Sequence, residues 1–118
     1  MCRAVWVVIV ARDEDAAKRL RRAAGIECQV VAMATSVADA GSILSDQTVD
    51  CVVLDAQTAA AHDEIVAIRA RAPHAAIVWI GDESPADVEQ SVQWSDEISD
   101  ALPGAITKAL LARKRTAG

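Results

Sequence analysis

The sequence predicts a single α/β domain: a five-stranded parallel sheet in the order 2-1-3-4-5, with helices on both faces. Three continuous apolar runs have the composition of strands that are buried on both faces, namely Val5–Val10, Cys51–Leu54 and Ala76–Ile80. Segments with apolar residues at helical spacing lie between them, and this alternation is typical of a parallel sheet. The length of 118 residues suits one domain.

The first helix is expected to follow the first strand directly. Acids from Asp13 onward fill its first turn, and apolar residues repeat at helical spacing as far as Ala24. Gly25 can end the helix in the left-handed conformation. A short strand is then expected at Cys28–Ala32.

The middle of the chain predicts a helix, a buried strand and another helix. Ser36, with an acid three residues later, resembles a capping box and opens the second helix. The run Cys51–Leu54 is the third strand and ends on Asp55. A helix is expected over Ala60–Ala72, and Pro73 ends it.

The last third of the chain predicts two more strand–helix units. After Ala76–Ile80, the segment starting at Ser84 combines a cap, a first-turn proline and an acid, which indicates a helix start. A weak, short strand is expected at Glu97–Ser99. Pro103 is expected to open the final helix, which runs to about residue 114, with Arg115–Gly118 as a short tail. We expect residues 1–118 to be the N-terminal domain of a longer protein.

Composition narrows the class of function. The net charge of −5 argues against nucleic acid as a direct partner. No apolar run approaches the ~20 residues that cross a membrane, so we expect a cytoplasmic protein. Cys2, Cys28 and Cys51 are scattered and the two histidines stand alone, which favours neither a disulfide framework nor a zinc site. Trp6 and Trp79 are expected in the core.

Candidate chemistry lies at the carboxyl ends of the strands, where open parallel sheets bind ligands. The first strand presents Arg12 and Asp13 there, the third Asp55, the fourth Gly81 and the fifth Asp100. Asp55 stands out because a carboxylate at the mouth of the sheet can act as a nucleophile and form an aspartyl phosphate. The alternative is a strand-end aspartate that accepts a backbone hydrogen bond in a turn.

The five-unit pattern, the length and the segment Val49–Asp55 resemble the receiver domain of response regulators in two-component signalling, a flavodoxin-like fold. The resemblance is specific at the third strand and architectural elsewhere. It implies that Asp55 is the phospho-acceptor, with Mg²⁺ as cofactor and a sensor histidine kinase or phosphotransfer protein as partner. It also implies an output domain, fused or separate, and no enzymatic activity beyond autophosphorylation of Asp55 from a donor.

The sequence departs from the receiver pattern at the positions that bind the metal and the phosphoryl group. Ala11 and Arg12 stand where the family has two adjacent acids, so Asp55 and Asp13 are weak candidate metal ligands, and Arg12 could sit close to Asp55. Gly81 replaces a threonine or serine. The lysine position falls on Asp100 by strand register or on Leu102 by the proline that follows. These losses predict a degenerate receiver, or pseudo-receiver, with weak Mg²⁺ binding.

Two other functions remain open. A phosphorylation-independent dimerisation or adaptor domain would have the same fold. A small α/β nucleotide-binding protein is disfavoured because no GxGxxG or GxxxxGK[ST] motif follows a strand. The arginines of the first helix fit either a solvated face or a docking patch.

Acids crowd into the stretch between Asp82 and Asp100. Asp87 and Glu89, on a fourth helix, are expected to form one acidic face with the acids around the fifth strand, near Trp94. No lysine or arginine occurs between Arg71 and Lys108. We therefore expect this face to repel a second copy of itself, and to meet a basic partner or to pair only through Trp94 and the last helix.

Overall fold

Five parallel strands form one sheet in the order β2-β1-β3-β4-β5, which confirms the predicted topology. The computed structural model describes residues 5–24, 28–34, 49–55, 61–72, 75–81, 88–93 and 98–117. The elements are β1 Val5–Val10, α1 Glu14–Ala24, β2 Cys28–Ala34, β3 Cys51–Asp55, α3 Ala61–Arg71, β4 Ala76–Ile80, β5 Gln90–Val92 and α4 Ile98–Ala117.

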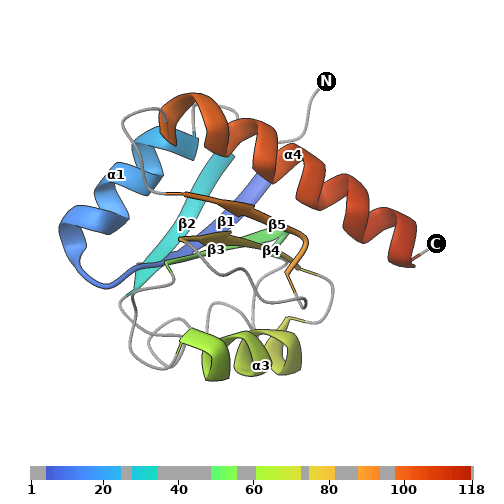
Figure 1. The fold of residues 1–118 in the computed structure, drawn as a ribbon. Coiled ribbons are helices and arrows are strands. Elements are labelled where there is room, and N and C mark those ends of the chain that lie inside the picture. The colour runs from blue at the N-terminus through green and yellow to red at the C-terminus, as the bar shows by residue number, and fades with distance from the viewer. Residues whose placement is uncertain are drawn as a thin grey trace.

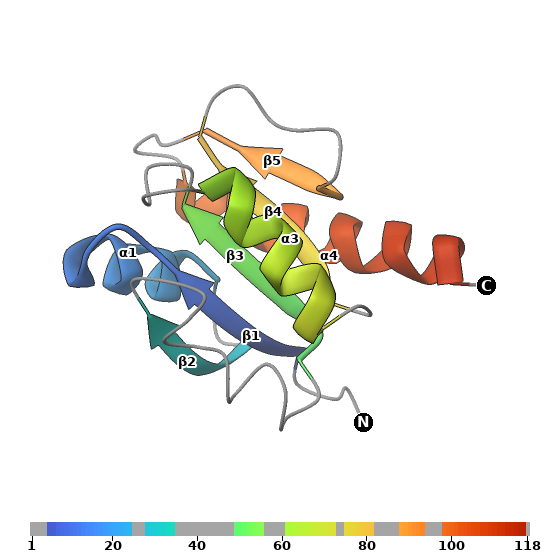
Figure 2. The same cartoon turned by 90° about the horizontal axis from the view of Figure 1, so that it is seen from below.

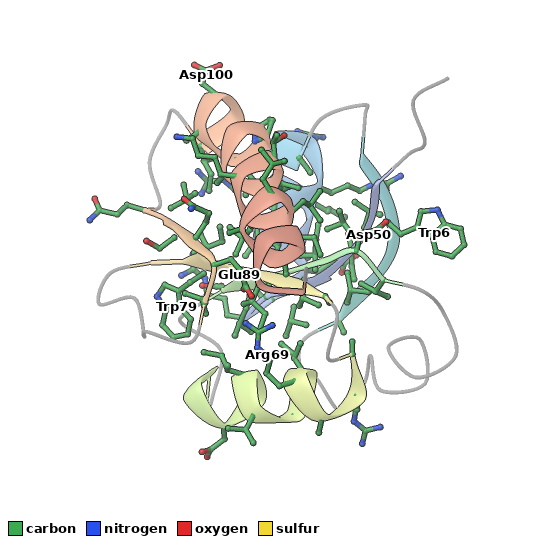
Figure 3. All side chains as sticks on the ribbon, turned by 90° about the vertical axis from the view of Figure 1, so that its right-hand side faces the viewer. Trp6, Asp50, Arg69, Trp79, Glu89 and Asp100 are labelled. Carbon is green, nitrogen blue, oxygen red and sulfur yellow. The ribbon has the colours of Figure 1, made fainter. Side chains whose placement is uncertain are left out.

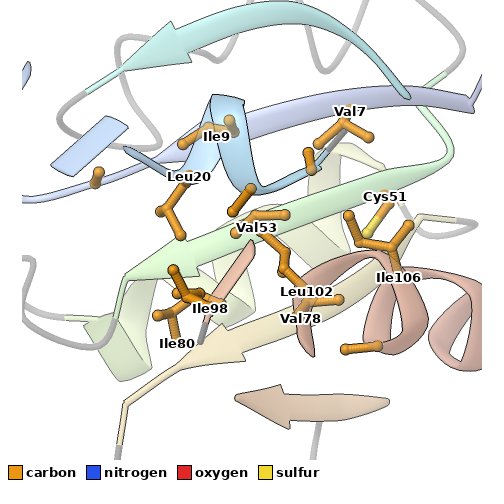
Figure 4. Packing of buried hydrophobic residues seen from close by; sticks show 14 of the residues in the cluster. Val7, Ile9, Leu20, Cys51, Val53, Val78, Ile80, Ile98, Leu102 and Ile106 are labelled. Atoms are coloured by element: carbon orange, nitrogen blue, oxygen red, sulfur yellow. The ribbon is translucent and has the colours of Figure 1, made fainter. Parts of the chain in front are cut away.

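The sheet is covered on both faces, as Figure 1 shows: α1 and α4 lie on one side and α3 on the other. Residues of β1 alternate between two apolar clusters, because successive side chains of a strand point to opposite faces. Val7 and Ile9 pack with α1 and α4 (Figure 4), whereas Val8 and Val10 pack with residues of α3. Figure 2 shows α3 lying across its face of the sheet, with α4 behind it. The central strands are therefore apolar along their length, except for Asp55 at the end of β3.

The strands that were predicted before β5 agree closely with the structure. The first, third and fourth strands lie where they were expected, and Asp55 is the last residue of β3. The second strand is longer than predicted and ends at Ala34. The second helix, expected from Ser36, lies outside the described residues. Trp79 is in the core with 2 % of its surface exposed, but Trp6 is only half-buried and was wrongly assigned to the core.

The last third of the chain corrects the prediction. The fifth strand is Gln90–Val92, not Glu97–Ser99, and Glu89 is therefore not helical. The last helix begins at Ile98, so Pro103 lies inside it, and the helix continues to Ala117 rather than ending near residue 114. Neither Asp87 nor Trp94 belongs to the described residues. None of the helices described is long and apolar enough to span a membrane.

Tertiary contacts rather than local propensity define the start of β5. Glu89 exchanges backbone and side-chain hydrogen bonds with Ile77 of β4: its N–H donates to the Ile77 carbonyl at 3.2 Å, and its Oε2 accepts the Ile77 N–H at 2.8 Å. Arg69 of α3 donates from Nη2 to both carboxylate oxygens of Glu89, at 2.7 and 2.9 Å, and from Nη1 to the Ala75 carbonyl. Figure 3 shows Arg69 and Glu89 facing one another between α3 and the sheet.

This ion pair removes Glu89 from the expected acidic face. The Glu89 side chain is 10 % exposed and that of Arg69 is 25 % exposed, so both charges are largely withdrawn from water. A charge in such a place is tolerated because a partner compensates it. Glu89 is therefore a structural residue that joins α3, β4 and β5.

We predict that Arg69→Met destabilises the domain by about 2 kcal/mol, because it leaves the Glu89 carboxylate buried without its cation. The value is below that for fully buried pairs because both side chains keep some contact with water. Urea denaturation should measure it, with Arg71→Met at the exposed end of the same helix as the control. Equal stabilities of the two variants would contradict a structural role for the pair.

Candidate functional site

Asp55 ends β3 at the centre of the sheet and is completely buried. Its strand lies between β1 and β4, and Asp55 itself pairs with Ile80, the last residue of β4. Burying a carboxylate away from water costs free energy unless hydrogen bonds and an opposite charge compensate it. The residues that supply them decide what the site can do.

Arg12, just beyond the end of β1, supplies Asp55 with both a hydrogen bond and an opposite charge. Its backbone N–H donates to Asp55 Oδ2 at 3.2 Å, and its Nε lies 3.8 Å from the same oxygen. The chain is held in place there because the N–H of Ala11 donates to the carbonyl of Ala34 in β2, at 2.9 Å. The expected proximity of Arg12 and Asp55 is thus observed. One backbone hydrogen bond to Asp55 thus comes from a neighbouring strand end.

Asp13 also lies near the guanidinium of Arg12, and it caps the start of α1. Its Oδ1 accepts the N–H of Ala16 at 2.8 Å, which makes it the N-cap of the helix. Its Oδ2 is 4.0 Å from Nε of Arg12. The side chain of Asp13 is 60 % exposed, so this second contact is weak, and the carboxylate is held mainly by the helix start.

These residues do not fit Mg²⁺, the cofactor implied by the resemblance. Mg²⁺ takes oxygen ligands in a nearly octahedral arrangement, with carboxylates directed at the metal. Here Nε of Arg12 lies 3.8 Å from Oδ2 of Asp55 and 4.0 Å from Oδ2 of Asp13, so a guanidinium already provides a positive charge near both carboxylates. Within the residues that the structure describes, no three His, Cys, Asp or Glu side chains gather as a metal site.

Gly81 follows β4 beside Asp55, as predicted, and has a backbone reason to be glycine. Its φ of 146° lies in the region that side-chain-bearing residues rarely adopt. Its N–H donates to the carbonyl of Val92 at 2.8 Å, which ties the ends of β4 and β5 together. A hydroxyl-bearing residue at this position would be strained unless the backbone changed.

Asp100 does not end the fifth strand. It lies in the first turn of α4, and Figure 3 shows its side chain directed away from the sheet. Leu102, the other candidate for the lysine position, is fully buried in the core. No lysine or arginine occurs between Arg71 and Lys108, so the segment that joins β5 to α4 contains no lysine, and the first lysine after β5 is Lys108 inside α4.

Sequence reasoning missed a groove between β5 and α4, because it misplaced the fifth strand. We call it the β5–α4 groove. It is lined by Gln90, Ser91, Val92, Gln93, Asp100, Ala101, Gly104, Ala105 and Lys108. The small residues of α4 in the segment 101–105 were the available sequence signal for this groove. They indicate a groove only when β5 is known to lie beside them.

Comparison with solved structures identifies the fold. The signal receiver domain of an HD domain-containing protein from Pseudomonas fluorescens Pf-5 superposes with a TM-score of 0.77 at 15 % identity, over 96 % of this chain and 99 % of that one. The response regulator domain of Thermotoga maritima CheB also gives 0.77, at 14 % identity, over 92 % and 98 %. The fold is that of a receiver domain.

A third receiver structure agrees, and sequence comparison adds nothing. The signal receiver domain of the putative response regulator NarL from Mycobacterium tuberculosis gives a TM-score of 0.66 at 20 % identity, over 94 % of this chain and 97 % of that one. No family model matches the sequence, and no curated protein matches it. The likeness of this chain to receiver domains therefore lies in its fold.

We predict that Mg²⁺ binds with a dissociation constant of about 1 mM or higher, because Arg12 already neutralises Asp55. Arg12→Asp should bind Mg²⁺ at least about tenfold more tightly, since the change removes a competing cation and adds a ligand. Isothermal titration calorimetry should measure both. Arg22→Asp, at the exposed end of α1, makes the same change in net charge and should leave the affinity unaltered.

Tight Mg²⁺ binding by the unmodified protein would show that Arg12 moves aside and that Asp13 rebuilds the site.

Proposed function

We propose that the chain is a receiver-like domain of a two-component phosphorelay. In this proposal it acts through contact with other proteins, in the cytoplasm, and Asp55 is its phospho-acceptor. The observation that carries the proposal is the position of Asp55: a buried carboxylate at the carboxyl end of the central strand of a receiver fold. The partners would be a sensor histidine kinase or a phosphotransfer protein, together with a fused or separate output domain.

The chemistry of the proposed step is simple. An oxygen of the Asp55 carboxylate attacks the phosphorus of the donor, a P–O bond forms, and the bond from phosphorus to the donor breaks. The Arg12 guanidinium opposes this step while it pairs with Asp55, because a paired carboxylate is a weaker nucleophile. The same guanidinium can neutralise part of the charge of the phosphoryl group once that group is attached.

A second candidate is a phosphorylation-independent adaptor of the same fold. The contact between Arg12 and Asp55 favours it, because the pocket already contains the positive charge that a metal would bring. Protein contacts would then be made without any change at Asp55. A nucleotide-binding function has no comparable support, since the turns that follow the strands carry no phosphate-binding glycine motif.

We predict that a small phosphodonor or a phosphorylated phosphotransfer protein, in the presence of Mg²⁺, adds one phosphoryl group to Asp55. Asp55→Asn should abolish the modification, and Asp63→Asn on the exposed face of α3 should not. Arg12→Asp should react several-fold faster, because the nucleophile is released from its ion pair and gains a metal. Intact-mass spectrometry with peptide mapping reports all three results.

Failure of both the unmodified protein and Arg12→Asp to take up phosphate would contradict the phosphorelay proposal. It would leave the adaptor as the function to pursue.

A further inference from the structure

The fifth strand buries little of its own surface. β5 lies at the edge of the sheet and none of its three residues is buried, whereas all five residues of the neighbouring β4 are. The apolar residue of β5, Val92, is only partly buried where it packs against the core on the side of α4. Burial of apolar surface is the main source of stability in a folded chain. The side chains of β5 therefore contribute little to keeping this strand on the sheet.

Among the residues that the structure describes, hydrogen bonds attach β5 to β4 at both of its ends. At the carboxyl end, the N–H of Gly81 donates to the Val92 carbonyl at 2.8 Å. At the amino end, Glu89 and Ile77 exchange two hydrogen bonds, of which one uses the backbone N–H of Glu89 and the other its carboxylate. The attachment at the amino end thus depends on the position of one side chain.

Arg69 of α3 holds the Glu89 carboxylate in the position that this attachment requires (Figure 3). Its Nη2 donates to both carboxylate oxygens, and its Nη1 donates to the Ala75 carbonyl at 2.9 Å, directly before β4. A planar guanidinium that binds a carboxylate through two hydrogen bonds restrains both groups. Because the Glu89 side chain is 10 % exposed, water has little access to replace Arg69 as its partner.

We infer that β5 can leave the sheet while the rest of the domain stays folded, and that the Arg69–Glu89 ion pair controls how often it does so. Segments with few buried apolar contacts open at a lower free energy than the core of a domain. With β5 released, β4 becomes the edge of the sheet. The unpaired backbone groups of its residues Ala76–Ile80 then form a template on which an extended segment of another protein can pair.

This inference goes beyond the structural role of the ion pair and does not depend on phosphorylation of Asp55. A pair that only stabilised the whole domain would break when the whole domain unfolds, and β5 would leave the sheet together with the core. The inference instead requires a second, smaller opening, in which the ion pair and the contacts of β5 are lost and the sheet from β2 to β4 remains.

Hydrogen exchange of single backbone amides, measured by NMR at several urea concentrations below the unfolding transition, tests the inference. The amides of Ile77 and Gly81 donate to Glu89 and Val92, so they report on the release of β5. The amides of the fully buried β3 report on unfolding of the whole domain. In the unmodified protein, Ile77 and Gly81 should share one protection factor, at least about tenfold smaller than that of β3. Their exchange should depend only weakly on urea, because the small opening exposes little surface.

Three variants separate the release of β5 from the stability of the whole domain. Arg69→Met should speed up exchange at Ile77 and Gly81 by about tenfold or more, together with β3, because neither opening then breaks an ion pair. Ile9→Val removes a buried methyl group in β1, which β3 and β4 separate from β5. It should speed up exchange in β3 by about fivefold and leave Ile77 and Gly81 unchanged. Arg71→Met, at the exposed end of α3, should change neither rate.

The inference is overturned if, in the unmodified protein, Ile77 and Gly81 have the protection factor and the urea dependence of β3. It is also overturned if Ile9→Val speeds up exchange equally at Ile77, Gly81 and β3, or if Arg69→Met leaves exchange at Ile77 and Gly81 unchanged.

Discussion

The buried carboxylate of Asp55 is the constraint on which the site depends. It closes the central strand of the sheet, where water does not reach it, so the chain must provide its hydrogen bonds and its countercharge. Arg12 provides a backbone N–H and a guanidinium from the neighbouring strand end. One side chain thus performs the electrostatic task for which a metal site needs a cation from solution, and the loop between β1 and α1 is tied to β3 as a consequence.

At the same end of the sheet, Asp13 and Gly81 also differ from the pattern of a receiver site, and each of them has a structural role. Asp13 caps the start of α1 with one carboxylate oxygen, and its second oxygen lies near Arg12. Gly81 has a positive φ, and its N–H donates a hydrogen bond to the Val92 carbonyl that links β4 to β5. Each residue has a structural role that is compatible with the fold but not with the ligand set of a metal-dependent phosphate pocket. A fold alone does not determine the chemistry of its site, which depends on the side chains at the strand ends.

Sequence reasoning worked where burial dominates. The apolar runs of β1, β3 and β4 are buried on both faces, and such strands need a composition that few other elements share. It failed at β5, because Gln90–Val92 is an edge strand with one apolar residue, and its position comes from the ladder to β4 and from the bonds of Glu89 to Ile77. Because of Pro103, the start of the last helix was predicted too late in the chain. The helix begins at Ile98, because Ile98 and Leu102 pack into the core.

The site, like the fold, could be predicted only in part. Asp55, Arg12 and Gly81 could be placed from strand ends alone, because parallel strands bring their carboxyl ends to one edge. Asp100 could not, since its assignment depended on a strand that lies elsewhere. The pairing of Glu89 with Arg69 joins residues from separate elements, and neither spacing nor charge pattern indicates it before the fold is known.

The central claim is that the Arg12 side chain serves as the countercharge of Asp55, and a double-mutant cycle tests it most directly. Urea denaturation of the unmodified protein, Arg12→Ala, Asp55→Asn and the double variant gives their coupling energy. We predict about 1 kcal/mol, a moderate value because the Arg12 side chain is 34 % exposed and its Nε lies 3.8 Å from the carboxylate oxygen. Strictly additive effects of the two substitutions would contradict the claim.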